Sequence, residues 1–158
     1  MDEAIRVISY FRQAGKTLAT AESCTGGLLG KLLTDVPGSS AVYPGGVISY
    51  CNEVKRAVLG VDAKVLEGEG AVCAPVAAQM AENVRTLMNA DYGISTTGVA
   101  GPGSDDRGNP AGLVYAAIAD REETKVLELH LSGTREEIRE AAAKALFSEL
   151  LRVTEVRP

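Results

Sequence analysis

The sequence has very few of the side chains on which metal sites and histidine-based catalysis depend. Its 158 residues include one histidine, three cysteines and no tryptophan. His130 lies in an alternating run typical of a strand, and there is no second histidine for a Ser-His triad or for most metal sites. Cys24, Cys51 and Cys73 lie far apart without a Cys-x-x-Cys pair, which favours reduced thiols over disulfides or zinc. We therefore expect no metal ion.

Long apolar runs and blocks of one charge are also missing. No segment approaches 18 uninterrupted apolar residues, and the charged residues 1–6 contain no apolar signal segment, so we expect a cytoplasmic protein without a membrane partner. The net charge is -5, and the basic residues form no block. This argues against a nucleic acid partner, which normally requires a basic face. A small anionic ligand stays compatible, because one or two arginines or a helix end can bind it.

What the sequence does contain is an alternation of helical and extended patterns within one domain, residues 1–158. Helical periodicity covers residues 2–13, 25–33, 53–59, 63–69, 75–88 and 136–151, and extended patterns cover 18–21, 39–50, 92–97, 113–119 and 125–131. The last two extended segments predict a hairpin. This order predicts a three-layer α/β domain with a mixed sheet. Because ligands collect at the carboxyl ends of strands, we expect three glycine-bearing turns, 23–27, 98–103 and 133–135, to meet there.

Ser23 falls at the turn between the first predicted strand and the following helix. Such a turn exposes a side chain at the carboxyl edge of the sheet and directs the free N–H groups of the helix start towards a ligand. Gly26 and Gly27 would let a ligand approach that backbone. An equally supported interpretation makes Ser23 an N-cap and the two glycines packing positions. The turn alone does not separate these interpretations.

The remaining chemistry that could serve Ser23 belongs to Tyr50 and Lys55, at the end of a strand and the start of a helix. A neutral lysine can accept the serine proton, and a tyrosine can relay or orient it, if burial lowers the lysine pKa. Spacing alone favours a packing role for Tyr50 and a solvated Lys55, since lysine is mostly a surface residue. Arg135, beside a helix start, fits either a phosphate ligand or an ordinary surface arginine.

Five ordered blocks resemble the CinA carboxy-terminal domain family, which includes the nicotinamide mononucleotide deamidases. These blocks are AESCTGG at 21–27, DxPGSS at 35–40, GVISYxNxxK at 46–55, GxAGP at 98–102 and PxG at 110–112. The resemblance runs from about residue 3 to residue 151. It implies an α/β/α fold with a five-stranded mixed sheet. It also implies hydrolysis of the carboxamide of nicotinamide mononucleotide to nicotinic acid mononucleotide and ammonia, without a metal or organic cofactor.

The resemblance also implies roles for individual residues. Ser23 is the expected nucleophile, Lys55 the general base and Tyr50 the partner of Lys55. The residues expected to contact the nucleotide substrate are Thr25, Gly26, Gly27, Gly46, Thr97, Gly98, Gly101 and, at the phosphate, Arg135. We further expect backbone N–H groups of residues 25–27 to stabilise the oxyanion.

Three features depart from the family pattern without touching the expected catalytic residues. Cys51 replaces a usual serine, residues 103–107 read GSDDR where a second Gly-Gly is common, and Asn109 replaces a frequent lysine. These changes bear on substrate affinity and specificity.

Two functions remain as alternatives to the deamidase: a nucleotide-binding module without turnover and a serine-lysine amidase for another amide. The apolar faces of the first and last predicted helices could pack either in the core or in a dimer interface. A homo-oligomer is therefore compatible with the sequence.

Overall fold

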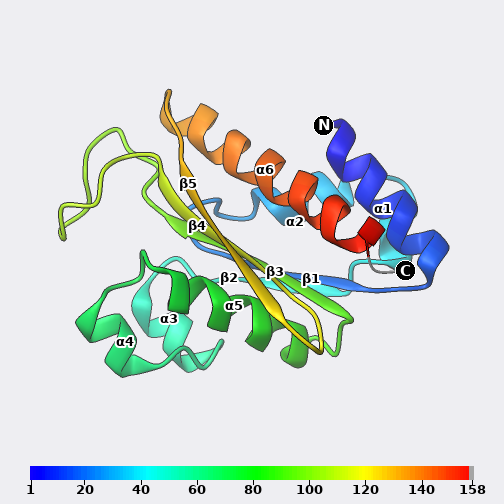
Figure 1. The fold of residues 1–158 in the computed structure, drawn as a ribbon, viewed down its shortest axis with the longest axis horizontal. Coiled ribbons are helices and arrows are strands. Elements are labelled where there is room, and N and C mark those ends of the chain that lie inside the picture. Colours follow the sequence, from blue (N-terminus) through cyan, green and yellow to red (C-terminus); the bar gives the residue numbers. More distant parts are fainter. Residues whose placement is uncertain (157–158) are drawn as a thin grey trace.

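A five-stranded mixed sheet forms the middle layer of the computed structural model, which describes residues 1–156 (Figure 1). Its strands are β1 (Leu18–Glu22), β2 (Gly45–Ile48), β3 (Tyr92–Gly98), β4 (Leu113–Ala119) and β5 (Thr124–His130). They lie in the order β2-β1-β3-β4-β5. β1 pairs in parallel with β2 and β3, and β4 runs antiparallel to β3 and β5. The predicted five-stranded mixed sheet is therefore confirmed.

Helices cover both faces of this sheet, which gives the predicted α/β/α layers. On one face lie α1 (Asp2–Ala14), α2 (Leu28–Thr34) and α6 (Arg135–Val156). On the other lie α3 (Asn52–Ala57), α4 (Ala63–Gly68) and α5 (Ala74–Leu87). Several boundaries differ from those expected from the sequence, among them two between β1 and β2. Residues predicted as extended include a 3-10 turn at Ser39–Ala41, and α2 begins at Leu28 rather than near Thr25.

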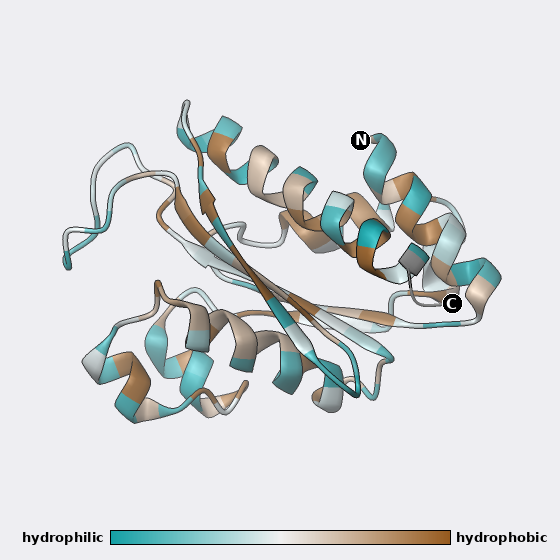
Figure 2. Cartoon of the chain, in the orientation of Figure 1, coloured by the Kyte–Doolittle hydropathy of each residue, from teal (hydrophilic) through white to brown (hydrophobic). Residues whose placement is uncertain are grey.

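The apolar stripes of α1 and α6 pack into the core on one face of the sheet. Phe11 of α1 and Leu146 and Phe147 of α6 are fully buried in the same cluster as Ile94 of β3. Figure 2 shows hydrophobic colour along the strands and on stretches of the helices, and hydrophilic colour at the turn between β4 and β5. The two helix faces that the sequence left open to a dimer interface are thus used by the core.

The parallel strands bring the expected turns to one edge of the sheet. Glu22 of β1 is in register with Ile48 of β2 and Thr96 of β3, so residues 23–27, 49–52 and 98–103 follow from the same edge. β5 ends at this edge as well, because Leu113 at the start of β4 pairs with His130. Residues 133–135 therefore reach it from β5. The prediction that three glycine-bearing turns meet at the carboxyl edge is correct.

Within residues 1–156, none of the helices has the length and apolar character needed to cross a membrane. The same part of the chain holds no group of three or more histidine, cysteine or acidic side chains placed to bind a metal ion. Cys24 and Cys73 are buried free thiols, and Cys51 is an exposed one. His130 lies in β5, as the alternating pattern predicted.

Candidate active site

The Ser23 hydroxyl and the Lys55 amine are in direct contact just beyond the carboxyl end of β1. Lys55 Nζ donates a hydrogen bond to Ser23 Oγ at 2.8 Å and another to the carbonyl oxygen of Ser49 at 2.7 Å. Lys55 is the fourth residue of α3, and its side chain is only 1% exposed. Among residues 1–156 no carboxylate forms an ion pair with it. The structure therefore buries this lysine against neutral oxygen atoms.

This environment favours the neutral form of Lys55. Burial lowers the pKa of Lys55, because a charged amine loses hydration that two neutral acceptors replace only in part. Ionised thiols of Cys51 and Cys24 would act in the opposite direction. A deprotonated Nζ at this position is within hydrogen-bonding distance of the Ser23 proton. The pair thus has the geometry of a nucleophile and its general base.

The start of α2 is not open to a ligand, contrary to the prediction, because the carboxylate of Glu22 occupies it. Glu22 is 2% exposed. Its Oε1 accepts hydrogen bonds from the backbone N–H groups of Gly27 (3.2 Å) and Leu29 (2.8 Å), and its Oε2 from that of Gly30 (3.1 Å). An internal anion therefore satisfies the positive end of this helix. Gly27, rather than Ser23, is the N-cap residue of α2.

Two backbone N–H groups beside Ser23 nevertheless remain available. The Ser23 N–H donates to Thr96 O, the Gly26 N–H to Ser23 O and the Gly27 N–H to Glu22. In the part of the chain that the structure describes, the N–H groups of Cys24 and Thr25 donate to no other residue. Of the expected oxyanion donors, residues 25–27, Gly26 and Gly27 are therefore already bonded, and the N–H groups without another partner are those of Thr25 and the neighbouring Cys24.

A cleft of about 470 Å³ opens beside Ser23. It is lined by Ser23, Cys24, Tyr50, Val72, Gly98, Val99, Ala100, Gly101, Gly103, Ser104, Asp105 and Arg135. Tyr50 is 61% exposed, and its hydroxyl accepts a hydrogen bond from Arg135 Nη2 at 2.8 Å. Among the described residues Tyr50 makes no hydrogen bond to Lys55. The expected pairing of Tyr50 with Lys55 is thus replaced by a pairing with Arg135.

Three residues expected to contact substrate do not line the cleft. Thr25 is fully buried, and its hydroxyl bonds to Glu22 Oε1 and Thr96 Oγ1, both at 2.7 Å. Thr97 donates to the carbonyl oxygen of Ala71 at 2.8 Å. Gly46 lies inside the sheet, where an added Cβ would come within 2.2 Å of Thr20 Oγ1. The Thr25 and Thr97 hydroxyls are thus bonded within the protein, whereas Gly98 and Gly101 line the cleft.

A second hollow, of about 330 Å³, shares Cys24, Tyr50 and Arg135 with the lining of the cleft. It is lined by Cys24, Gly26, Ile48, Tyr50, Arg135 and Arg139. Sequence reasoning missed Arg139. The available signal was its spacing, because residues four apart on a helix share one face, and Arg135 was already a candidate. The structure thus adds a second guanidinium to the site.

The residues that depart from the family pattern fix the loop between β3 and β4. The Asp105 carboxylate accepts hydrogen bonds from the backbone N–H groups of Arg107 and Asn109 and from the Asn109 side chain. The Arg107 guanidinium donates to the carbonyl oxygens of Leu66, Glu67 and Gly68 in α4. Because Asp105 lines the cleft, these contacts give one of its walls a defined position.

Comparisons with known proteins point to a single family. The model of the CinA C-terminal domain matches residues 2–154. A putative competence-damage inducible protein of Caldanaerobacter subterraneus is 50% identical over 151 residues, which cover 96% of this chain and 37% of that protein. A CinA-like protein of Acidobacterium capsulatum is 45% identical over 138 residues, covering 87% and 33%. The chain spans about a third of the length of these curated relatives.

Solved structures of the same name have the same fold. A competence/damage inducible protein from Agrobacterium tumefaciens superposes with a TM-score of 0.93 at 37% identity, over 97% of this chain and 94% of that one. The competence damage-inducible protein A from Klebsiella pneumoniae superposes with a TM-score of 0.92 at 32% identity, over 94% and 92%. These similarities extend over the whole α/β/α domain, including the edge that carries Ser23 and Lys55.

Proposed function

The chain belongs to the CinA C-terminal domain family, and from this premise we propose that it is an amidohydrolase. Its proposed substrate is nicotinamide mononucleotide, deamidated to nicotinic acid mononucleotide and ammonia in cytoplasmic pyridine nucleotide salvage. One observation carries the proposal: the buried Lys55 amine lies 2.8 Å from Ser23 Oγ and pairs with no carboxylate of the described chain. A carboxylate would stabilise the charged amine and remove its use as a base.

In the proposed first half-reaction, Ser23 Oγ attacks the carboxamide carbon while neutral Lys55 accepts the hydroxyl proton. A C–O bond forms, and the carbonyl π electrons move to the oxygen atom. The free N–H groups of Cys24 and Thr25 would donate to that oxyanion. Protonated Lys55 then gives its proton to the amide nitrogen, the C–N bond breaks, and ammonia leaves an acyl-enzyme.

The second half-reaction repeats these steps with water as the nucleophile. Lys55 accepts a proton from water, whose oxygen attacks the acyl carbon, and the same two N–H groups stabilise the new oxyanion. Collapse breaks the bond to Ser23 Oγ, which takes the proton back from Lys55. The products are the free carboxylate and the regenerated Ser23–Lys55 pair.

The charges around the cleft support a phosphorylated substrate. Arg135 donates to Gly101 O at 2.6 Å and to the Tyr50 hydroxyl, and Arg139 donates to two backbone carbonyl oxygens. Within residues 1–156 neither guanidinium forms an ion pair. Arg135 lines both hollows and can exchange its neutral acceptors for a phosphate, with which it makes stronger, charge-assisted hydrogen bonds.

The test is ammonia release from nicotinamide mononucleotide by the purified chain without added metal, beside Ser23→Ala, Lys55→Ala and the matched control Lys125→Ala. We expect turnover that is lost in the first two variants and kept in the control. Arg135→Ala should raise KM for the nucleotide but not for the corresponding nucleoside. A wild-type chain that releases no ammonia yet is thermally stabilised by the nucleotide would instead be a binding module without turnover.

A further inference from the structure

We propose that Arg139 is a positioning residue that fixes the peptide unit between Cys24 and Thr25 and closes the turn after Ser23, so that the Thr25 N–H group, together with that of Cys24, forms a preorganised oxyanion site. The inference rests on the proposed acyl-transfer function. It assigns to Arg139 a role distinct from that of Arg135, although both guanidinium groups line the same hollow.

Arg139 bonds directly to the turn that carries the nucleophile. Its Nε donates to the carbonyl oxygen of Cys24 at 3.2 Å, and its Nη2 donates to that of Thr25 at 2.8 Å. The guanidinium comes from α6, more than 100 residues further along the chain. Two donors of one rigid, planar group thus hold two consecutive carbonyl oxygens of this turn.

Fixing the Cys24 carbonyl group also fixes the N–H group of the same peptide unit, which is that of Thr25. In a planar trans peptide the C=O and N–H bonds point in opposite directions, so the bond to Cys24 O directs the Thr25 N–H away from Arg139. The preceding peptide unit is held in the same way, because Ser23 O accepts the Gly26 N–H at 3.0 Å. The Thr25 carbonyl oxygen, which accepts from Arg139 and from the Leu28 N–H, closes the turn.

The bonds of Arg139 distinguish its role from that of a substrate ligand. Both acceptors of Arg139 are backbone carbonyl oxygens beside the nucleophile, which substrate binding leaves in place. Arg135 instead holds the exposed Tyr50 hydroxyl and the carbonyl oxygen of Gly101 in the β3–β4 loop. Loss of Arg139 should therefore weaken stabilisation of the transition state, whereas loss of Arg135 should weaken binding of the phosphate.

The experiment compares Arg139→Lys, which keeps the charge but not the paired donors, with Arg135→Lys. Each is assayed with nicotinamide mononucleotide and with nicotinamide riboside. For Arg139→Lys we expect kcat to fall by about 10- to 100-fold on both compounds, with KM within about threefold of wild type. An unchanged dissociation constant for the nucleotide shows that the variant is folded. A rise in KM confined to the phosphorylated compound would overturn the proposal and make Arg139 a phosphate ligand.

A second measurement tests the role of Arg139 without relying on the proposed substrate. A fluorophosphonate probe reacts with an activated serine and places its phosphoryl oxygen where the oxyanion forms. We expect Ser23 of Arg139→Lys to be labelled about tenfold more slowly than in wild type, and Arg152→Lys, changed at the exposed far end of α6, to be labelled at the wild-type rate. If wild type takes the label but releases no ammonia, the proposed substrate fails and slower labelling of Arg139→Lys still supports positioning. Equal labelling rates in wild type and Arg139→Lys would overturn it.

Discussion

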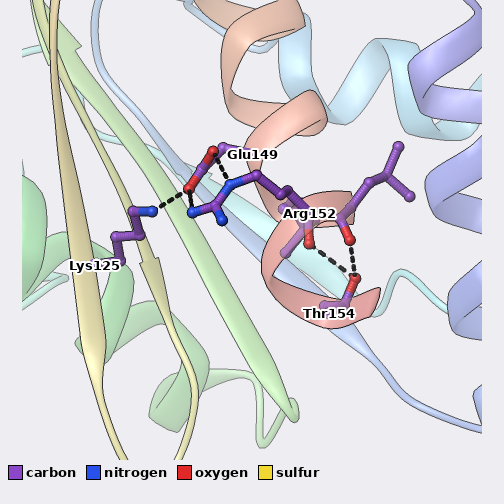
Figure 3. Close-up of polar contacts among 6 residues, drawn as sticks. Lys125, Glu149, Arg152 and Thr154 are labelled. Atoms are coloured by element: carbon purple, nitrogen blue, oxygen red, sulfur yellow. Dashed lines mark hydrogen bonds and ion pairs between the residues drawn. The ribbon is translucent and has the colours of Figure 1, made fainter. Parts of the chain in front are cut away.

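Lys55 and Lys125 carry the same amine, but the fold surrounds them with opposite chemistry. Lys55 is 1% exposed and donates to two neutral oxygen atoms, those of Ser23 and Ser49. The Lys125 side chain is 40% exposed and forms an ion pair with Glu149. Figure 3 shows that Glu149 also accepts two hydrogen bonds from Arg152, so this cluster joins β5 to the last turns of α6.

The difference concerns which protonation state each site stabilises. Glu149 forms an ion pair with the Lys125 ammonium group, and this pair contributes to stability without any reactive partner. No described carboxylate pairs with Lys55, and burial lowers its pKa. Lys125 is the second residue of β5, and the other end of this strand reaches the edge that carries Ser23. A lysine that contributes to stability and a lysine suited to chemistry thus lie at opposite ends of one sheet.

The largest expected effect comes from removing each amine in turn. Lys55→Met keeps most of the buried stem and removes the base, so kcat for ammonia release should fall by about 10³-fold. Lys125→Met should leave kcat unchanged, because the Lys125 amine pairs with Glu149 and lies at the end of β5 opposite to the Ser23 edge. Steady-state assays of both variants measure this contrast. If Lys55→Met kept more than about a tenth of wild-type kcat, the amine would not be the general base.

The pH dependence of activity should report Lys55 and not Lys125. The reaction needs the neutral amine, so kcat/KM should rise about tenfold per pH unit and level off at the lowered pKa of Lys55. Lys125→Met should leave the midpoint of this rise unchanged. A profile that falls with increasing pH would contradict a neutral lysine base.

The sequence predicted the contact of Ser23 with Lys55 better than it predicted the surroundings of that contact. Strand and helix periodicity placed both residues at one sheet edge, because these patterns depend on local burial. Spacing alone favoured a solvated Lys55, and only the family resemblance implied that it serves Ser23. The role of Glu22 was not predictable in the same way, since glutamate is rarely buried and its partners are backbone groups that a sequence does not display. The pairing of Tyr50 with Arg135 joins segments 85 residues apart, and nothing local encodes it.

The carboxylates of the buried Glu22 and the partly buried Glu149 extend the comparison to stability. Glu22→Gln replaces a carboxylate that binds three backbone N–H groups and the Thr25 hydroxyl with an amide that has one acceptor oxygen. We expect it to lower the free energy of unfolding by about 2–3 kcal/mol, because N–H groups of α2 lose a charged partner. Urea unfolding measures the loss. A cost below about 1 kcal/mol would mean that water replaces the carboxylate at the start of α2.

The smallest loss of stability is expected for a change at Glu149, because this carboxylate and its partners are more exposed to solvent than Glu22. Hydrogen bonds from Arg152 and Lys125 lower the pKa of Glu149 from 4.5 to about 2. A carboxylate with a lowered pKa in the folded state contributes stability above its unfolded pKa, and this contribution is lost as the pH falls through the folded pKa. Glu149→Gln should therefore lower the free energy of unfolding by about 1 kcal/mol at pH 7, a modest value because both partner side chains are partly exposed.

The dependence of stability on acid pH tests whether Glu149 acts through its charge. The stability difference between wild type and Glu149→Gln should hold down to about pH 4.5 and shrink between about pH 4.5 and pH 2, because wild type takes up the proton that the amide variant cannot. Urea titrations at intervals across this range measure it, and high salt at pH 7 should reduce the same difference. A difference that stayed constant into strong acid would show that Glu149 acts through packing, and Lys125 would then lose its assigned electrostatic role.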